Sequence, residues 1–221
     1  MGANVKSKTK LALACAAFAL CSYTLFSQSH ISTQSHQSSV TSLAPQLFGV
    51  INDKAVFSGA LDGFLIKWTE DGLGEHYQIT DMPIRLIARS PNGNDIAVYE
   101  SDGAAVNRVS IWNWKTFTRK YAFRFTDGVT SLAFSAKGSY LICGTATVSG
   151  TVFINTANGS VISRKLSEST GVVTMSYTSD SENSLVLYSP TTGSLSYYNL
   201  RNGSVKAKFE TEPLLGQPCM F

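Results

Sequence analysis

The sequence predicts an all-β fold made of repeated four-stranded antiparallel units. One observation is a recurring order of turns and apolar strands with a period of about 44 residues. Gly93 and Gly138 are 45 residues apart, and Asn183 lies another 45 residues on. A second observation is that the residues expected to close the third strand of each unit step by 44, 42 and 44 residues: Trp68, Trp112, Ile154 and Tyr198.

The first unit contains the stretch GALDGFLIKW, residues 59–68. Asp62 and Gly63 predict a tight hairpin turn, because glycine tolerates a positive φ and aspartate can hydrogen-bond its own backbone. Residues 56–58 lie on one side of this turn, and the aromatic and β-branched residues 64–68 lie on the other. Strand interiors favour such side chains, so this stretch predicts one hairpin.

The later units add the remaining strands. Short apolar or alternating segments precede the hairpins at residues 84–88, 129–134 and 172–177, and others follow them at residues 160–165 and 204–209. Four strands per unit are typical of a β-propeller blade. The residues expected in the structural turns are Asp62, Gly63, Gly93, Gly103, Gly138, Gly150 and Gly193.

Residues 47–211 resemble WD-repeat blades. The segments SPNGNDIAVYESDG through VSIWNW, and GALDGFLIKW, are similar to the family pattern of a D-G turn between the second and third strands and a Trp that closes the third. Two features depart from it. Thr69, Asn113, Asn155 and Asn199 replace the Asp after the closing Trp position, and the Gly-His pair before the outer strand is missing. The family's Asp–His hydrogen-bond network is therefore not predicted here.

The chain divides into four segments by composition. Residues 1–29 read as a signal peptide or an N-terminal anchor, and residues 30–46 as a linker rich in Ser and Gln. Residues 47–211 hold the blades, and residues 212–221 are a tail or an aborted next blade. The blade count leaves three alternatives: a four-bladed ring, a truncated descendant of a longer ring, or a half-ring that pairs with another chain.

The N-terminal segment predicts export. Lys6, Lys8 and Lys10 precede an apolar run at residues 11–26, and small residues follow it. The run is short for a membrane span, which needs about 20 residues, so cleavage is favoured over an anchor formed by residues 11–26. The three lysines account for the whole formal charge of +3. Because the remaining chain is then neutral, a nucleic-acid partner is not expected.

The sequence predicts no catalytic, cofactor or metal site. His76 is the only histidine within the blade region, no C-x-x-C or G-x-S-x-G pattern occurs, and the acidic residues are scattered at turns. His30 and His36 lie in the expected linker, which cannot fix metal ligands. Cys143 is expected in the core, whereas Cys219 lies near the C-terminus.

The predicted function is a non-enzymatic scaffold that binds a protein in the periplasm or cell envelope. This step rests on fold analogy. Trp114 and Tyr197 are candidates for the contact surface, because each lies beside a core position and could face either outward or into a neighbouring blade. Self-association is a further possibility for an open array of blades, and the alternative function is an enzyme or ligand sensor with a site at the axial mouth of the ring.

Overall fold

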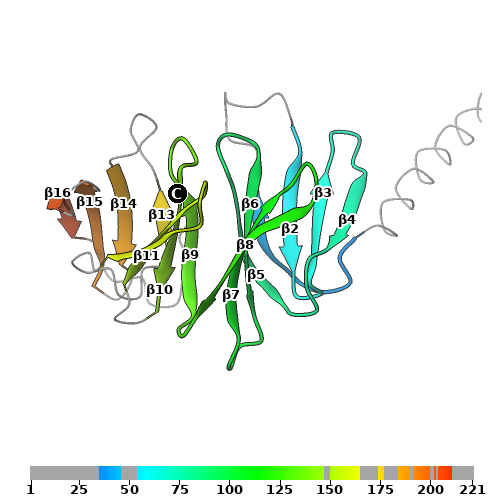
Figure 1. The fold of residues 1–221 in the computed structure, drawn as a ribbon, viewed down its shortest axis with the longest axis horizontal. Coiled ribbons are helices and arrows are strands. Elements are labelled where there is room, and N and C mark those ends of the chain that lie inside the picture. Colours follow the sequence, from blue (N-terminus) through cyan, green and yellow to red (C-terminus); the bar gives the residue numbers. More distant parts are fainter. Residues whose placement is uncertain are drawn as a thin grey trace, which may run out of the picture.

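The computed structural model describes residues 35–45, 54–146, 150–164, 174–176, 184–189, 192–199, 202 and 204–210. Within these residues the chain is all-β and forms four antiparallel four-stranded sheets (Figure 1). The first two blades contain β1 (Val40–Ala44), β2 (Val56–Ala60), β3 (Phe64–Trp68), β4 (Gly74–Gln78), β5 (Ile84–Arg89), β6 (Asp95–Ser101), β7 (Asn107–Asn113) and β8 (Thr118–Phe125). The other two contain β9 (Val129–Phe134), β10 (Tyr140–Thr145), β11 (Thr151–Asn155), β12 (Val161–Arg164), β13 (Thr174–Ser176), β14 (Ser184–Ser189), β15 (Ser194–Asn199) and β16 (Ser204–Glu210).

The four-stranded antiparallel blade predicted from the repeat is confirmed. In each sheet the hydrogen-bonded order of the strands follows the chain, so every connection within a blade is a hairpin. The outer strands β8 and β16 are mostly exposed, with partly buried residues in between, as expected where one face of a strand meets solvent.

The predicted linker at residues 30–46 is wrong in its second half. Val40–Ala44 form β1, which pairs with β2 and places Ala44 opposite Phe57. The first blade therefore begins before residue 47. The Ser- and Thr-rich composition hid this strand, because most of β1 is exposed and only Ala44 is buried. Residues 1–34 and 211–221, which include the predicted signal segment and tail, lie outside the described residues.

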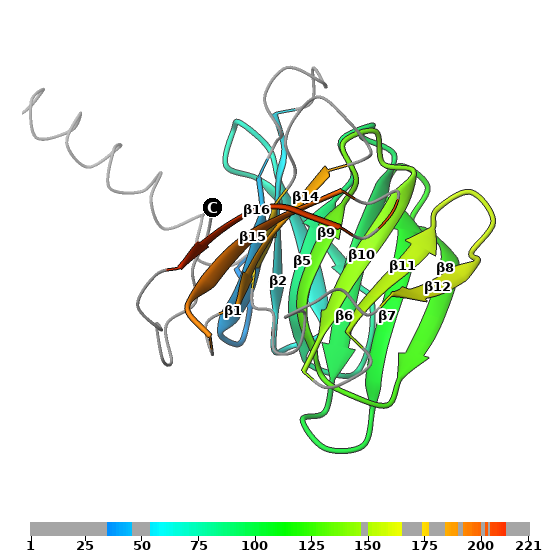
Figure 2. The same ribbon diagram turned by 90° about the vertical axis from the view of Figure 1, so that its left-hand side faces the viewer.

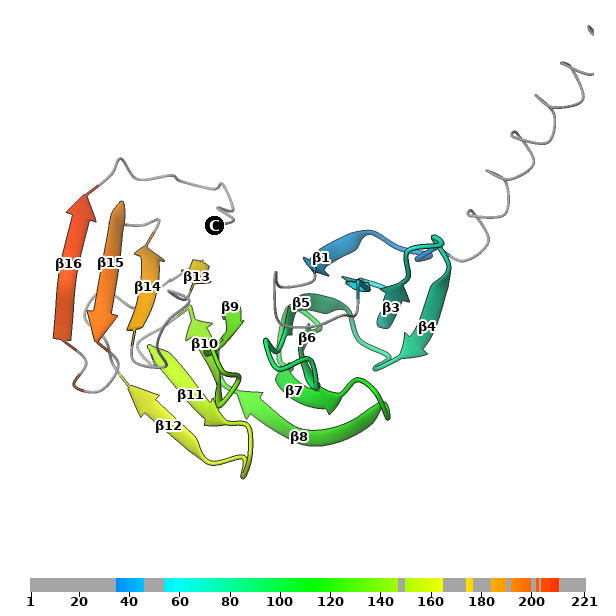
Figure 3. The ribbon, with the colours of Figure 1, turned by 90° about the horizontal axis from the view of Figure 1, so that it is seen from above.

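The blades stand side by side around a common axis and form an open arc (Figure 3). Contacts between the inner strands run in the order β1, β5, β9 and β13. The first and fourth blades lie at the two ends of the arc, and Figure 2 looks at the molecule from the side of the fourth. Among the described residues no helix is long and apolar enough to cross a membrane.

Apolar side chains fill the spaces between neighbouring blades. Phe57 and Leu65 of the first blade pack against Ile96 and Trp114 of the second. A second cluster joins blades two and three and a third joins blades three and four, where Tyr198 packs on Phe153. Burial between faces, rather than within one central core, therefore holds the blades together.

The predicted turn glycines are confirmed by their backbone conformation. Positive φ values occur at all six: Gly63, Gly93, Gly103, Gly138, Gly150 and Gly193. Gly63 has the most confined position. Its φ is 78°, and a Cβ atom there would lie 2.2 Å from the carbonyl oxygen of Thr80 in the β4–β5 loop. The Gly63 carbonyl also accepts hydrogen bonds from the N–H groups of Ile79 and Thr80.

We expect Gly63→Val to destabilise the protein more than Gly72→Val. Gly72 has nearly the same φ, 77°, but nothing lies within 4 Å of its Cβ position. Gly72→Val should therefore lower the free energy of unfolding by about 1–2 kcal/mol for the left-handed backbone alone. The clash at Gly63 should add about 1–3 kcal/mol. Urea unfolding of both variants would measure the difference, and equal losses would contradict the packing of Gly63 on Thr80.

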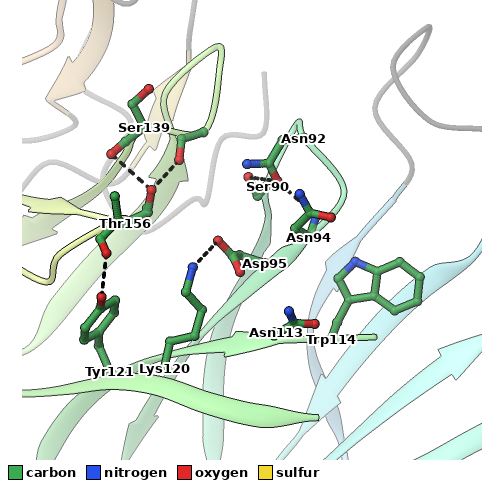
Figure 4. A network of polar contacts seen from close by, with 12 residues as sticks. Ser90, Asn92, Asn94, Asp95, Asn113, Trp114, Lys120, Tyr121, Ser139 and Thr156 are labelled. Carbon is green, nitrogen blue, oxygen red and sulfur yellow. Dashed lines mark hydrogen bonds and ion pairs between the residues drawn. The ribbon is translucent and has the colours of Figure 1, made fainter. Parts of the chain in front are cut away.

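Turns of the second and third blades interlock at one end of the molecule (Figure 4). The Tyr121 hydroxyl on β8 donates a hydrogen bond of 2.8 Å to the carbonyl oxygen of Ala157 in the third blade. Gly138 fits against Ser90, since a Cβ atom there would lie 2.4 Å from Ser90 Oγ. Within the third blade, Thr156 Oγ1 donates to the Gly138 carbonyl oxygen. This interlock joins the second and third blades at one end of the molecule. It thereby also fixes how the two blades face each other at the other end.

Candidate functional site

A cavity of about 620 Å³ lies between the second and third blades, at the end opposite the interlocked turns. We call this the cavity end. The β6–β7 loop, the β8–β9 loop and the adjoining ends of β5, β6, β7 and β9 line the cavity. Its principal side chains are Arg85, Leu86, Tyr99, Asn107, Asp127 and Thr130.

Asn107 is held in one orientation on the cavity wall. Its Oδ1 atom accepts a 2.7 Å hydrogen bond from the Tyr99 hydroxyl and a 3.0 Å bond from Ser101 Oγ. Ser101 Oγ in turn accepts a bond from the N–H of Gly103. Because both neighbours donate to Oδ1, the Asn107 amide nitrogen keeps its two N–H donors for another acceptor.

Arg85 supplies the positive charge of the cavity. Its Nε atom donates to the carbonyl oxygen of Ser101 at 3.4 Å, which orients the guanidinium. Gly103 lies beside Arg85 Nη2 and has no side chain to cover it: even a Cβ atom there would be 3.7 Å away. Asp127, from the β8–β9 loop, brings a carboxylate to the same cavity.

Asp102 shapes the β6–β7 loop at the cavity mouth. Its Oδ1 atom accepts hydrogen bonds of 2.9–3.1 Å from the N–H groups of Ala104, Ala105 and Val106. These bonds, led by the one from Val106, lower the pKa of the exposed Asp102 carboxyl. The charged carboxylate thus fixes the loop whose Gly103 and Ala104 line the cavity.

A chain of hydrogen bonds ties the segment before β1 to the first blade. Trp68 Nε1 donates to Ser58 Oγ at 2.8 Å, and Ser58 Oγ lies 2.7 Å from His36 Nε2. His36 Nδ1 lies 3.1 Å from the Asp62 carboxylate. In the neutral tautomer that Asp62 favours, Nδ1–H donates to Asp62 and Nε2 accepts from Ser58. The sequence interpretation missed this role of His36, which it placed in a solvated linker.

Ser58, His36 and Asp62 have the connectivity of a hydrolytic triad, but their surroundings indicate a structural role. A nucleophilic hydroxyl must reach a substrate. Ser58 is only 2% exposed, and its oxygen already has two partners, His36 and Trp68. Asp62 also accepts the backbone N–H groups of Gln37 and Phe64. The network therefore binds strand, turn and preceding segment together.

The second blade has a comparable network with different residues. Trp112 Nε1 donates to Ser110 Oγ at 2.8 Å, and Ser110 donates to Glu100 Oε1 at 3.0 Å. Glu100 is 1% exposed and forms an ion pair with Arg108, whose pKa is raised by this contact. The matching face of the third blade is apolar, with Leu141, Cys143, Val152 and Ile154. The Arg108–Glu100 ion pair of the second blade thus takes the place of the His36–Asp62 contact of the first blade.

The two candidate contact residues lie in different surroundings. Trp114 is 8% exposed, stacks edge-on against Phe57 and donates its N–H to the carbonyl oxygen of Gly93. Of the two placements that the sequence left open, the structure shows the second: the side chain turns into the neighbouring first blade, so Trp114 is not part of a contact surface. Tyr197 is half-buried, with its hydroxyl bonded to Ser184 and Lys206 over its ring. Neither residue lines the cavity.

The remaining reactive side chains stand apart from the cavity. His76 is exposed on β4, where its ring meets the edge of Phe64. Cys143 is fully buried, and burial raises the pKa of its thiol. In the described part of the chain no group of three or more His, Cys, Asp or Glu side chains is placed to hold a metal ion.

Cys143 should report global unfolding. We expect a chain of residues 30–221 with Cys219→Ser, in which Cys143 is the remaining thiol, to react with a disulfide reagent at pH 8 only as fast as the protein opens. Burial excludes the reagent, and the raised pKa leaves little thiolate to attack it. Reaction rates with and without denaturant measure this. A native rate equal to that of a free thiol would contradict the packing of β10.

Comparison with known proteins places the chain in a family. A model described as "TP_0598_N: N-terminal beta-propeller domain" matches residues 27–221. An uncharacterized protein of Treponema pallidum (strain Nichols) is 34% identical over 171 residues, which is 77% of this chain. The match spans 27% of that relative, so the chain corresponds to about a quarter of its length. The chain belongs to this family of N-terminal β-propeller domains.

Proposed function

We propose that the chain is an exported, non-enzymatic β-propeller that binds a protein partner in the periplasm or cell envelope. The observation that carries the proposal is the cavity between the second and third blades, with polar groups directed by rigid loops. Binding residues are commonly placed on loops held by a rigid scaffold. Here three chain segments from two blades, within residues 85–86, 99–107 and 126–130, converge at one end.

The hydrogen-bond networks support assignment to the WD-repeat type. In the first blade the Trp that closes the third strand is bonded to a Ser on the second strand, that Ser to a His before the first strand, and the His to the Asp of the D-G turn. The second blade keeps the closing Trp and a Ser partner.

Export is supported by the N-terminal sequence. Three lysines and the apolar run at residues 11–26 come first, and the family match begins at residue 27. We expect the processed protein to begin between Ser27 and His30, with an anchor at residues 11–26 as the alternative. N-terminal sequencing of protein from the native host tests this. An intact Met1 or Gly2 in a soluble cytoplasmic fraction would overturn export.

Site-specific photo-crosslinking tests the binding role. A photoreactive residue at Ala105, exposed in the β6–β7 loop, should trap a discrete partner in the native envelope. The same residue at Lys115, exposed at the opposite end, is the matched control. Equal products at both positions, or none at Ala105, would overturn a partner at the cavity end.

Sensing of a small ligand is the second candidate function, because the cavity volume falls in the range of small-molecule sites, about 300–1,000 Å³. Thermal stabilisation by a small molecule, together with no crosslinked protein at Ala105, would favour the sensor.

A further inference from the structure

We propose that the cavity between the second and third blades binds a carboxylate of an extended peptide, with Arg85 as its main partner. This inference rests on the proposed binding function and names the ligand chemistry of the same site. It concerns a short peptide segment, because a cavity of about 620 Å³ holds a few side chains and not a folded domain.

The unused polar groups of the cavity are mainly donors. The Nη atoms of Arg85 and the amide nitrogen of Asn107 have no hydrogen-bond partner among the described residues, while Arg85 Nε and Asn107 Oδ1 are occupied. The Arg85 and Asn107 donors together favour a ligand rich in acceptors.

A carboxylate fits this donor set better than a neutral acceptor. A guanidinium presents parallel N–H groups that match the two oxygens of a carboxylate, and such charge-assisted bonds are stronger than neutral ones. Arg85 is half-buried and Gly103 leaves its Nη2 uncovered, so the guanidinium is both partly desolvated and reachable. Asn107, fixed by Tyr99 and Ser101, offers its N–H donors without rearrangement.

Asp127 determines what must accompany the carboxylate. Its negative charge in the same cavity opposes a bare anion. A peptide carries N–H groups next to its carboxylate, and their dipoles reduce this repulsion, whereas acetate or phosphate has no such groups. Leu86, Val129 and Ala104 offer apolar surface for the carbons between them. The arrangement therefore suits a peptide rather than a free anion.

Ligand-observed NMR with short blocked peptides tests the proposal on the purified protein. The probes are acetyl-Gly-Glu-Gly-amide, its Gln analogue, and acetyl-Gly-Gly-Gly with a free terminal carboxylate. We expect the Glu peptide to bind at least about tenfold more tightly than the Gln peptide. The third probe distinguishes a side-chain from a terminal carboxylate as the source. Equal binding of the Glu and Gln peptides, with no binding of the third probe, would overturn the proposal.

Two variants assign the binding to Arg85. Arg85→Gln should abolish the preference for Glu over Gln, while Arg124→Gln, which changes an exposed arginine of β8 outside the cavity, should keep it. Thermal melts check that both variants fold. If the preference survives in Arg85→Gln, or if sodium acetate or inorganic phosphate competes as well as the peptide, the assignment fails. A crosslinked partner at Ala105 would leave the binding function standing even then.

Discussion

Replacing Arg108 by methionine should lower the free energy of unfolding by about 3–5 kcal/mol, the usual cost of leaving a buried charge without its partner. Arg108 on β7 is the ion-pair partner of Glu100, which is 1% exposed on the face that the first blade covers. Methionine fills a similar volume but cannot neutralise the carboxylate, and Ser110 alone remains as a donor to it. Denaturant unfolding at pH 7 would measure the loss.

Arg124→Met is the matched control for this prediction. Arg124 lies directly opposite Arg108 in the β7–β8 pairing and is exposed. Its loss removes a like charge from the same rung, so its effect should be within about 0.5 kcal/mol of zero. If Arg108→Met were equally mild, the Glu100–Arg108 pair would not hold the second blade in the way described. The double variant Glu100→Leu/Arg108→Met should recover part of the stability, because no buried charge is left.

A chain of residues 30–221 should self-associate at micromolar concentration through the fourth blade. Leu185, Leu187 and Tyr198 of this blade pack on the third blade. The alternate residues on β14, β15 and β16 are also apolar: Val186, Leu195, Tyr197 and Phe209. A sheet that is apolar on both faces is built to be covered on both, yet Phe209 is 61% exposed at the end of the arc.

Sedimentation velocity with two charge substitutions tests this association. Phe209→Glu should shift the protein toward monomer, because it places a charge in the uncovered face. Leu73→Glu is the control, since Leu73 is 57% exposed in the β3–β4 turn, away from that face. A monodisperse parent monomer, or an equal response of the two variants, would show that the uncovered face does not drive association.

The blade architecture and its turns could be predicted from sequence because they are local. A hairpin turn needs a positive φ at one or two residues. Glycines such as Gly63 and Gly138 mark these positions in the sequence, and both have a positive φ in the structure. The alternation of apolar residues in a strand has a period of two, which a short window reveals. The exposed strand β1 was missed for the same reason, because little of it is buried and its apolar pattern is weak.

The candidate site could not be predicted in this way because its residues are brought together from separate strands and loops. Arg85, Asn107 and Asp127 lie on three different segments, and nothing in their spacing shows that they share one cavity. Trp114 lies in the β7–β8 turn, and a local sequence pattern does not show that its side chain packs on Phe57 of the neighbouring blade.

The sequence by itself determined that this protein is a repeat of four-stranded blades, where the turns fall and which strands are outermost. The tertiary structure decided which distant residues meet. His36 reaches Asp62 across 26 residues, Glu100 and Arg108 replace such a pair in the next blade, and Arg85 and Asp127 come to face one cavity. The physical reason is that hairpins are fixed by backbone preferences of a few adjacent residues, whereas contacts between blades depend on how whole sheets pack, and side-chain burial there is set by the neighbour rather than by the local sequence.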